Sequence, residues 1–342
     1  MVTIREIARL ANVSRGTVDR VLNNRGGVSE ETAVRIREIA ASLGYRPNKA
    51  GIALAAQKKK LRIGAVIFSN DNPFFQKVLD GVRAKAEELS AYDCTVLIRI
   101  VPYDASAQVK AISELVAEQI HGLILTPFND PLVAGKINEL GDEGIPVITT
   151  NTDIDGTSRL AYVGSDYYQS GREAGGLMRL VTGGKAKAGI ITGSSQVLCH
   201  TERIAGFSDV ISSCPGIEIL DTLKNHDDEF ESYEVTRHFL RAHPEADAIF
   251  FAAAGLVGGC RAILNMNRTA GMRVICFDAE DIVLPMLKSG LISATISQKP
   301  VKQGSVPLEL LYEYLTTGIP PAADICIIET AIRIPESLSP SV

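Results

Sequence analysis

The hydrophobic pattern of this sequence changes its period near residue 60, and that change constrains the fold more than any other feature. From residue 61 onward, short apolar runs alternate with amphipathic stretches of 12–16 residues. This alternation is typical of a parallel β-sheet whose faces are covered by helices. Before residue 60, apolar residues recur only at helical spacing. The chain is therefore predicted to fold as an all-α head followed by an α/β body.

The body contains more predicted strands than one doubly wound sheet holds comfortably, so we expect two lobes with a parallel, Rossmann-like sheet in each. The strands are predicted at 63–68, 95–101, 122–125, 146–150, 161–163, 188–191, 217–222, 248–252, 274–277, 294–297 and 325–328. The helices are predicted at 74–89, 106–119, 131–143, 168–181, 201–212, 229–241, 256–267, 279–288 and 301–317. Ligands bind outside the carboxyl ends of parallel strands, so a cleft between the lobes is the expected place for a small molecule.

Charge is distributed unevenly between the head and the body. Residues 1–60 contain twelve Lys and Arg against five Asp and Glu, a net charge of +7. The other 282 residues carry −12, which makes up the −5 of the whole chain. A basic head on an acidic body suggests that the head binds a polyanion and that the body does not. A basic surface without a nucleic-acid role is the alternative that charge alone leaves open.

Membrane and secreted proteins are disfavoured by the sequence. No apolar run approaches the roughly 18 residues of a membrane helix. The N-terminus begins with a polar, periodic segment, whereas a secretion signal has an apolar core. The six cysteines are scattered and form no C-x-x-C pair, which favours buried free thiols in a reducing compartment. We therefore expect a cytoplasmic protein with no membrane partner.

The head carries start signals for three short helices. Thr3 and Glu6 form a capping box, in which each side chain satisfies a backbone donor of the other. Ser14 and Ser29 are placed as the N-caps of a second and a third helix. Two short helices joined by a few residues predict a helix-turn-helix, whose second helix lies in the major groove of DNA. The outward side chains of that helix are Arg15, Thr17 and Arg20. A small capped bundle without a nucleic-acid role is the alternative.

The head resembles the headpiece of the LacI family, the lactose and galactose repressors, at many positions and at fixed spacing. The matching runs are Val2-Thr3-Ile4-Arg5-Glu6-Ile7-Ala8, Ala11-Asn12-Val13-Ser14, Thr17-Val18, Arg20-Val21-Leu22-Asn23, Val28-Ser29 and Leu43-Gly44-Tyr45-Arg46-Pro47-Asn48. The resemblance implies that Arg15, Gly16 and Arg20 face bases, and that Thr17 and Asn23 hold phosphates. The DNA-binding residues that it implies are Thr3, Ser14, Arg15, Gly16, Thr17, Arg20, Asn23, Asn48 and Leu54.

Asp19 departs from the family pattern, which usually has a serine at this position. A carboxylate there would repel a phosphate, or it would accept a hydrogen bond from the amino group of a cytosine. The usual family contact at this position is therefore in doubt.

Residues 47–60 form a predicted hinge between the head and the body. Pro47 disfavours helix at the residue before it, and Gly51 costs roughly 1 kcal/mol against helix. By the resemblance, this segment orders on DNA as a short helix in the minor groove. Leu54 would then be a wedge that unstacks a central base step and kinks the duplex. The alternative is a flexible linker in which Leu54 only touches the next domain.

Polar and aromatic residues gather where the predicted strands end. They are Asn70, Asp71, Asn72, Phe74 and Phe75 after the first strand, Phe128, Asn129 and Asp130 after the third, Asn151, Thr152 and Asp153 after the fourth, and Asp278 and Gln298 in the second half. Amides and carboxylates beside aromatic rings suit a polyhydroxylated ligand, whose hydroxyls take hydrogen bonds and whose C–H face packs on a ring. Any one of these residues is equally explained by turn chemistry, but their position on successive strand ends favours a binding site.

Motifs of enzyme chemistry are missing from the sequence. It has no phosphate loop, no glycine-rich dinucleotide turn after the first strand, and no complete nucleophile elbow around Gly193-Ser194-Ser195. The five histidines lack metal-site spacing. We therefore expect a protein that is not an enzyme and needs neither a cofactor nor a metal.

The body, over about residues 61–330, resembles the periplasmic-binding-protein-like domain of the same family, and in detail the ribose-type sugar-binding proteins. The matching runs are Asn72-Pro73-Phe74-Phe75, Ile145-Pro146-Val147-Ile148-Thr149, Ser165-Asp166, Glu202-Arg203, Gly206-Phe207, Ala242-His243-Pro244, Phe277-Asp278, Ala294-Thr295-Ile296 and Gln298. The resemblance implies that Asn72 and Gln298 hold hydroxyls and that Phe74 and Phe75 stack on the sugar ring. The effector-binding residues that it implies are Asn72, Phe74, Phe75, Asp130, Asn151, Arg203, Asp227, Ala253, Asp278 and Gln298.

Three positions depart from the ribose binders. Asn151 replaces their aspartate, Ala253 replaces their asparagine, and Asp227 lies near their phenylalanine. Ribose itself is therefore doubtful as the ligand, while another monosaccharide, polyol or small polar molecule is expected. Arg203 and Asp278 would make charge-assisted hydrogen bonds from the second lobe, or they would form a structural ion pair.

Together these features predict a transcriptional regulator of the LacI family, with repression as the commoner mode. A homodimer would place two heads on a near-palindromic, double-stranded operator, and a small effector would control its affinity. The expected domains are a helix-turn-helix headpiece at 1–46, a hinge at 47–60 and an effector-binding and dimerisation domain at 61–342, with an N-lobe at about 61–164 and 299–325 and a C-lobe at about 165–298 and 326–342. The rival hypotheses are a plain sugar-binding protein and a sugar-modifying enzyme.

Overall fold

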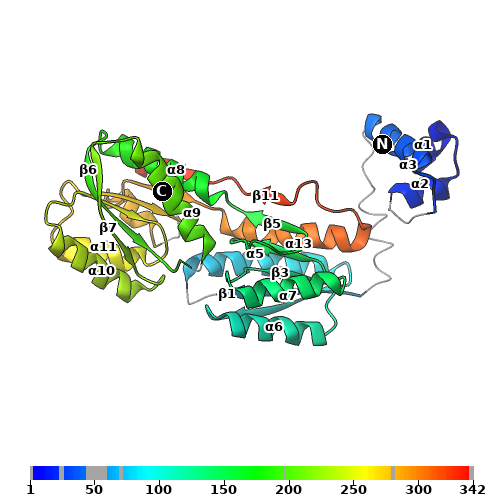
Figure 1. Ribbon diagram of the computed structural model, residues 1–342, viewed down its shortest axis with the longest axis horizontal. Helices are drawn as coiled ribbons and strands as arrows, with labels where there is room; N and C mark the ends of the chain where they lie inside the picture. The colour runs from blue at the N-terminus through cyan, green and yellow to red at the C-terminus, as the bar shows by residue number, and fades with distance from the viewer. Residues whose placement is uncertain are drawn as a thin grey trace.

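The computed structural model describes residues 3–22, 27–43, 60–68, 72–195, 197–278 and 282–338. Within these ranges the chain forms a small all-α head and two α/β lobes, each built on its own six-stranded sheet (Figure 1). The predicted fold class is confirmed. The predicted DNA-binding residues Asn23, Asn48 and Leu54 lie outside the described residues, as does all of the predicted hinge except Lys60.

The head packs three helices around one small apolar core. They are α1 (Ile4–Ala11), α2 (Arg15–Leu22) and α3 (Glu30–Ser42). The capping box of α1 is present: Oγ1 of Thr3 accepts from the amide of Glu6 at 3.3 Å, and Oε2 of Glu6 accepts from the amide of Thr3 at 3.2 Å. Ile7, Val18 and Ile36, one from each helix, are completely buried. Ser29 precedes α3 as predicted, but its hydroxyl donates to Oγ1 of Thr32 instead of capping the helix backbone.

The first sheet defines the N-lobe. Its strands are β1 (Leu61–Phe68), β2 (Cys94–Val101), β3 (Gly122–Leu125), β4 (Val147–Thr150), β5 (Ala161–Gly164) and β11 (Ile325–Ile327), in the order β11-β5-β4-β3-β1-β2 and all parallel. Its helices are α5 (Pro73–Ser90), α6 (Ala105–Ala117), α7 (Pro131–Asp142) and α13 (Pro300–Thr317). Helix α5 packs on α13, and α6 contacts α7 (Figure 1).

The second sheet defines the C-lobe. Its strands are β6 (Ala186–Thr192), β7 (Ile217–Lys224), β8 (Ala248–Phe251), β9 (Arg273–Phe277), β10 (Ala294–Ser297) and β12 (Ala331–Arg333), in the order β12-β10-β9-β8-β6-β7. Only β12 runs antiparallel in this sheet. The helices are α8 (Tyr167–Val181), α9 (Leu198–Ser212), α10 (Glu229–Ala242), α11 (Leu256–Asn265) and the short α12 (Leu284–Lys288), followed by the 3₁₀ turn η1 (Pro335–Ser337).

The chain passes between the lobes after β5, after β10 and between β11 and β12. The expected division at 325/326 is wrong by a few residues, because the whole of β11 pairs with β5 in the first sheet. Strand β12 was not expected at all. It is three residues long and lies at the sheet edge with Ile332 and Arg333 exposed, so it lacks the apolar run by which buried strands are recognised.

Each lobe places its switch point toward the same region between the lobes. In the first sheet the strand order reverses between β1 and β3, and in the second between β6 and β8. Ligand sites of doubly wound sheets form outside the carboxyl ends of strands at such points. A ligand site is therefore expected at the loops that follow β1, β4, β6, β8, β9 and β10.

Two further predictions can be checked in the described residues. All six cysteines are free thiols, and five of them are buried. None of the helices described is both long and apolar enough to cross a membrane.

Candidate functional site

A cavity between the two lobes brings together most of the residues predicted to bind an effector. The N-lobe contributes Phe68, Asn72, Phe74, Phe75, Tyr103 and Asn151, and the C-lobe contributes Val197, Cys199, His200, Arg203, Asp227, Ala254, Asp278 and Gln298. The cavity volume is only about 30 Å³, which is room for one or two water molecules. Typical small-molecule pockets measure roughly 300–1,000 Å³. The lobes or the lining side chains must therefore move apart to admit a ligand of monosaccharide size.

The N-lobe wall of the cavity is aromatic. Phe74 and Phe75 begin helix α5, and their rings meet edge to face with centroids 5.3 Å apart. Phe68 lies at the end of β1, and its ring centroid is 5.1 Å from that of Phe75 and 4.3 Å from that of Tyr103. Asn72 is the N-cap of α5, and its Oδ1 accepts from the amide of Phe74 at 2.9 Å. The wall thus offers ring faces and edges, with the amide group of Asn72 beside them.

Arg203, on α9, is the central cation of the C-lobe wall. Its side chain is buried, with Nη1 donating to the carbonyl of Ala252 at 2.9 Å and Nη2 donating to Oε1 of Gln298 at 2.7 Å. The guanidinium carbon lies 3.9 Å from the ring centroid of Phe277 and 4.8 Å from that of Tyr167. Its Nε–H group is also buried and has no hydrogen-bond partner within the described part of the chain. A buried donor without an acceptor is costly, so this nitrogen marks a place where a ligand oxygen would be stabilised.

Asp278 reaches Arg203 through Gln298 instead of by direct contact. Nε2 of Gln298 donates to Oδ1 of Asp278 at 2.5 Å, while Oε1 of Gln298 accepts from Arg203. Burial raises the pKa of the Asp278 carboxyl to about 6, and the nearby guanidinium and the Gln298 amide only partly oppose this rise. The direct ion pair considered from the sequence is replaced by a three-residue chain, in which Gln298 orients both charged groups.

His200 and Asp227 form a second polar pair in the cavity. Nε2 of His200 lies 3.5 Å from Oδ1 of Asp227, and the same carboxylate oxygen accepts from the amide of Ala254 at 3.0 Å. Nδ1 of His200 lies 3.1 Å from the carbonyl of Ser194. Burial lowers the pKa of His200, Asp227 opposes that shift, and Arg203 adds to it. Burial therefore favours the neutral imidazole, while both ring nitrogens face oxygen atoms, Nδ1 that of Ser194 and Nε2 that of Asp227.

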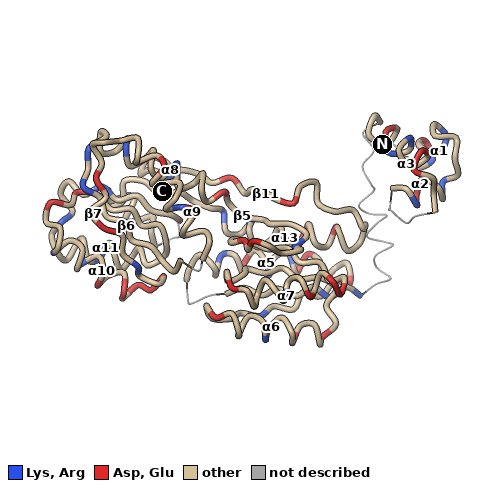
Figure 2. The backbone as a smooth tube through the Cα atoms, in the orientation of Figure 1, with Lys and Arg blue, Asp and Glu red and all other residues tan. Residues whose placement is uncertain are grey.

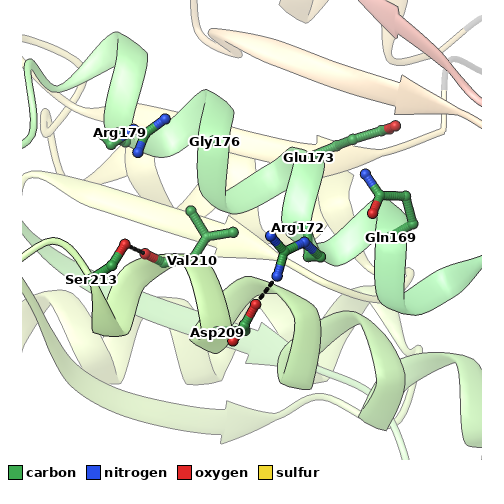
Figure 3. Close-up of a pocket in the computed structure, with 8 residues that line it drawn as sticks. All are labelled: Gln169, Arg172, Glu173, Gly176, Arg179, Asp209, Val210 and Ser213. Atoms are coloured by element: carbon green, nitrogen blue, oxygen red, sulfur yellow. Dashed lines mark hydrogen bonds and ion pairs between the residues drawn. The ribbon is translucent and has the colours of Figure 1, made fainter.

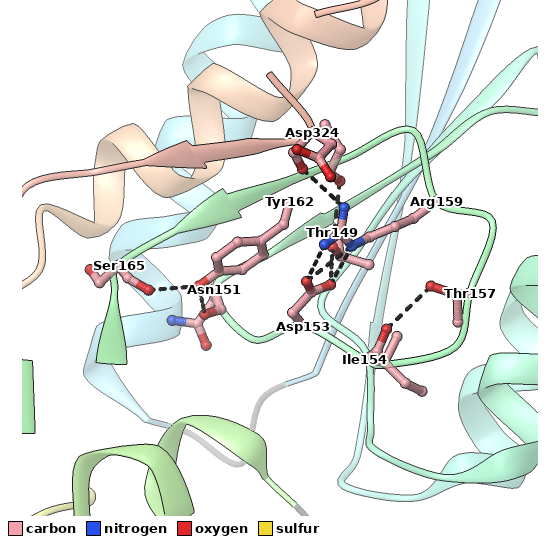
Figure 4. Close-up of polar contacts among 10 residues, drawn as sticks. Thr149, Asn151, Asp153, Ile154, Thr157, Arg159, Tyr162, Ser165 and Asp324 are labelled. Carbon is pink, nitrogen blue, oxygen red and sulfur yellow. Dashed lines mark hydrogen bonds and ion pairs between the residues drawn. The ribbon is translucent and has the colours of Figure 1, made fainter. Parts of the chain in front are cut away.

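Asn151 shapes the site from the loop after β4 (Figure 4). It has a left-handed backbone with φ 65°, and its carbonyl accepts from the hydroxyl of Tyr162 at 3.0 Å. Its Nδ2 donates to the hydroxyl of Tyr167 at 3.0 Å and to Oε1 of Gln303 at 3.0 Å. Further along the loop, Arg159 holds Asp153 with Nε 2.7 Å from Oδ1 and Nη2 2.6 Å from Oδ2. Both donors of Asn151 are thus committed within the protein, so this residue positions its neighbours more than it offers hydrogen bonds.

Two predicted effector-binding residues do not line the cavity. Asp130 is the N-cap of α7, where Oδ1 accepts from the amide of Leu132 at 2.9 Å. Ala253 is buried in the lobe, and the next residue, Ala254, lines the cavity instead. Asp130 was assigned from its place after a strand, which is also where helix-capping aspartates are favoured.

Six lining residues were missed: Phe68, Tyr103, Val197, Cys199, His200 and Ala254. His200 could have been found, because it lies one helical turn before Arg203 and so shares its helix face. Tyr103 also lies just beyond the end of a strand, β2. The others are apolar and indistinguishable from core residues in sequence.

The head exposes most of the described residues that were predicted to contact DNA. On α2, Arg15, Gly16 and Arg20 are exposed, while Val18 on the same helix is completely buried in the head. Oγ of Ser14 accepts from the amide of Thr17 at 3.1 Å, so Ser14 starts α2 as predicted. Basic and acidic residues both occur on the head and on the two lobes (Figure 2). Helix α2 therefore exposes two arginines, Arg15 and Arg20, to solvent.

A second cavity, of about 440 Å³, lies on the C-lobe between α8 and α9 (Figure 3). It is lined by Gln169, Arg172, Glu173, Gly176, Arg179, Asp209, Val210 and Ser213, none of which was predicted as a site residue. An ion pair joins Arg172 and Asp209, whose side chains are 41% and 45% exposed. Solvent screening makes such a pair weak. This second cavity is larger than the cavity between the lobes, but none of its lining residues has a buried side-chain donor or acceptor without a partner among the described residues. In the part of the chain described, no three His, Cys, Asp or Glu side chains are grouped to hold a metal ion.

Two family models match the chain. Residues 63–319 match the periplasmic binding protein domain, and residues 3–48 match the bacterial regulatory proteins of the lacI family. Among curated proteins, catabolite control protein A of Priestia megaterium is 24% identical over 324 residues, which cover 92% of each chain. The ribose operon repressor of Halalkalibacterium halodurans is 26% identical and covers 92% of this chain and 91% of its own.

Solved structures match the body. A glucose-galactose binding protein from Geobacillus stearothermophilus superposes with a TM-score of 0.75 at 26% identity, over 81% of this chain and 98% of that one. A solute binding protein from Bacillus halodurans with bound myo-inositol gives a TM-score of 0.76 at 20% identity, a likeness of fold alone. These structures match about four-fifths of the chain, and the lacI-family model matches the head at residues 3–48.

Proposed function

Because the chain belongs to the periplasmic-binding-protein domain family and carries the DNA-binding domain of the lacI family at its N-terminus, we propose that it is a sugar-responsive transcriptional repressor. The head binds a DNA operator in a sequence-specific manner. A small polyhydroxylated effector, a monosaccharide or a polyol, binds between the lobes and controls the affinity of the head for that operator. Repressors match this chain over nearly its full length, which supports this assignment above a plain sugar-binding protein.

The DNA-binding half of the proposal is supported by helix α2. Arg15, Gly16 and Arg20 are exposed on it, and Oγ of Ser14 caps its first turn by accepting from the amide of Thr17. Arginine reads guanine through two acceptors in the major groove. Asp19 lies on the same helix and is half-buried; a carboxylate at this position repels a phosphate or accepts a hydrogen bond from the amino group of a cytosine.

The effector half is carried by the unpaired Nε–H of Arg203. Arg203 lines the cavity, whose opposite wall on the N-lobe is aromatic, and its Nε–H is buried without a partner among the described residues. Carboxylates of Asp227 and Asp278 and the amide of Asn72 complete a set of groups that suits hydroxyls, while Phe74 and Phe75 suit the C–H face of a sugar ring. Ligand binding between the lobes would change their relative arrangement.

Coupling to DNA requires that the effector binds the two lobe arrangements with different affinity. We place the protein in the cytoplasm as a homodimer, with two heads in successive major grooves of a near-palindromic operator. A lobe rotation would then alter whether both heads fit their half-sites. The protein does not act as an enzyme in this scheme, and it needs no cofactor.

The proposal is tested by the salt dependence of DNA binding. The full chain is titrated onto fluorescent duplex DNA at several salt concentrations from about 50 to about 200 mM. The logarithm of Kd is then plotted against the logarithm of the salt concentration. If the head neutralises phosphates, log Kd rises with log salt with a slope of roughly 0.9 for each phosphate contacted. A flat plot would contradict DNA binding by the head.

A further inference from the structure

Helices α8 and α9 of the C-lobe cross with their backbones in contact at two glycines. A Cβ atom on Gly171 would overlap the carbonyl oxygen of Arg203, and one on Gly206 would overlap the carbonyl oxygen of Tyr168. Tyr168 precedes Gly171 by three residues, and Arg203 precedes Gly206 by three residues, so the contact is reciprocal. Glycine is the residue that permits such a close approach of two backbones. A larger residue at either position would therefore push the two helices apart.

The N-lobe contains the same reciprocal contact between helices α5 and α13. A Cβ atom on Gly81 would overlap the carbonyl oxygen of Val301, and one on Gly304 would overlap the carbonyl oxygen of Val78. The glycine again follows the contacted carbonyl by three residues on each helix. The two lobes thus share one geometry at this crossing, although the residues around their glycines differ.

Each of these contacts fixes a helix of the cavity wall to a helix that follows a passage between the lobes. Helix α5 carries Phe74 and Phe75, and helix α9 carries Arg203. Helix α8 begins just after the passage that follows β5, and α13 begins just after the passage that follows β10. The position of each wall is therefore set by the helix on which it rests and, through that helix, by a connection between the lobes.

Arg203 depends on the C-lobe contact most directly, because its own backbone takes part in it. Tyr167, whose ring centroid lies 4.8 Å from the guanidinium carbon of Arg203, is one helical turn before Gly171. The guanidinium also donates to the residues that follow β8 and β10, over 2.9 and 2.7 Å. Hydrogen bonds from N–H to oxygen span only about 0.5 Å in length, so a displacement of α9 by about 1 Å breaks them.

We propose that Gly171 and Gly206 are positioning residues of the effector site, and that Gly81 and Gly304 are their counterparts in the N-lobe. None of the four lines the cavity. They hold Arg203, whose buried Nε–H has no partner among the described residues, and the aromatic wall where both contact one sugar. The inference rests on the proposed effector function and extends its site to residues outside the cavity.

Alanine variants of three glycines on α8 test the proposal, because the space around these glycines differs. Gly171→Ala overlaps a backbone oxygen, Gly175→Ala places its Cβ 2.9 Å from Cβ of Val210, and Gly176→Ala meets no atom within 4 Å. The probe is whichever of D-glucose, D-galactose, D-ribose and myo-inositol raises the melting temperature of the full wild-type chain most. Calorimetry then gives the Kd of that probe for each folded variant.

The expected losses of affinity follow the crowding at each glycine. The Kd should rise about 100-fold in Gly171→Ala, as it does when a preorganised site is displaced by about 1 Å, and about tenfold in Gly175→Ala. In Gly176→Ala it should change by less than about twofold, as for a substitution that meets nothing.

A further pair of variants separates positioning from stability. Gly189→Ala crowds the buried ring of Phe239 in the core of the same lobe, so it should lower the melting temperature and leave the Kd unchanged. A glycine with a merely structural role would behave in the same way. Gly81→Ala crowds the N-lobe contact and should weaken binding of the same probe, although it lies on neither α8 nor α9.

The outcomes are distinct. An unchanged Kd in Gly171→Ala or, should that variant not fold, in Gly175→Ala would overturn the positioning role and leave the effector site in place. Equal weakening by Gly189→Ala would also overturn it, since any loss of stability would then suffice. Unchanged affinity in Gly81→Ala would remove the N-lobe pair from the proposal. Stabilisation of the wild type by none of the four probes would overturn the sugar-responsive function itself, and the inference with it.

Discussion

Nδ2 of Asn151 donates a hydrogen bond to Oε1 of Gln303 at 3.0 Å, joining residues 152 positions apart in the chain. Gln303 is completely buried, and its Nε2 donates to the carbonyl of Gln298 at 2.9 Å and lies 3.4 Å from Oγ of Ser165. Ser165 follows β5 and Gln298 follows β10, the two places where the chain first passes between the lobes. One side chain thus links the cavity residue Asn151 to both connections.

Replacing Gln303 should destabilise the body. Gln303→Met preserves length but leaves the carbonyl of Gln298 and one donor of Asn151 without a partner, so we expect a loss of about 1–3 kcal/mol in the free energy of unfolding. Urea unfolding followed by circular dichroism measures it. Gln169→Met, at an exposed position of α8, serves as the control and should change stability by less than about 0.5 kcal/mol. Equal losses in the two variants would contradict the role given to Gln303.

Arg203→Lys should abolish the thermal stabilisation by sugar while leaving DNA binding by the head intact. Lysine keeps the positive charge but loses the planar fork that bonds Ala252 and Gln298, and it loses the buried Nε–H proposed to bind a ligand oxygen. We expect at least about 100-fold weaker sugar binding, equivalent to roughly 2.7 kcal/mol. Arg172→Lys on the outer face of α8 is the matched control. A sugar response that survives Arg203→Lys would remove this residue from the site.

The stability of the body should depend on pH through Asp278. Its folded pKa is about 6 against an ordinary 3.8, so the folded state binds this proton more tightly than the unfolded chain does. The carboxyl therefore contributes stability that is fully present below pH 3.8 and is lost as the pH rises through about 6, up to roughly 3 kcal/mol.

His200 acts in the opposite direction, because burial lowers its pKa and acidification favours the unfolded, protonated form. The two contributions are separated by comparison of the wild type with Asp278→Asn, in which His200 and the neighbouring charges of Arg203 and Asp227 remain. The free energy of unfolding is measured at pH values from about 5 to about 7.5, in steps of about half a pH unit. The wild type should gain more stability than the variant as the pH falls; parallel curves would refute the shifted carboxyl.

Arg15→Ala should weaken operator binding by about 1–3 kcal/mol and relax the preference at one base pair, as expected when a base-reading arginine is lost. An operator is first selected from random duplexes with the full chain, and affinities for its single-base variants follow by fluorescence anisotropy. Arg9→Ala removes an equally exposed charge from α1 of the same head. If Arg9→Ala changed base preference as much as Arg15→Ala, α2 would not be the reading helix.

The predictions that succeeded depended on local pattern. The capping box of Thr3 and Glu6, the alternation of apolar runs and the aromatic pair Phe74 and Phe75 after β1 are all readable within a few residues. Asp130 caps α7 and does not line the cavity, and a helix cap and a ligand-binding carboxylate look alike in sequence. Ala253 and Ala254 differ by one position, and only the path of the loop decides which of them lines the cavity.

The sequence by itself determined the division into an α head and an α/β body, because hydrophobic periodicity is set by the geometry of each helix or strand. It also determined which segments end in polar groups. Only the tertiary structure decided which of these groups meet, because the contacts that matter join distant segments. The chain from Arg203 through Gln298 to Asp278, the pairing of His200 with Asp227, and the link from Asn151 to Gln303 arise where strands of two sheets end side by side. Burial in that place raises the pKa of Asp278 and leaves Nε of Arg203 without a partner among the residues described, and no local pattern encodes either effect.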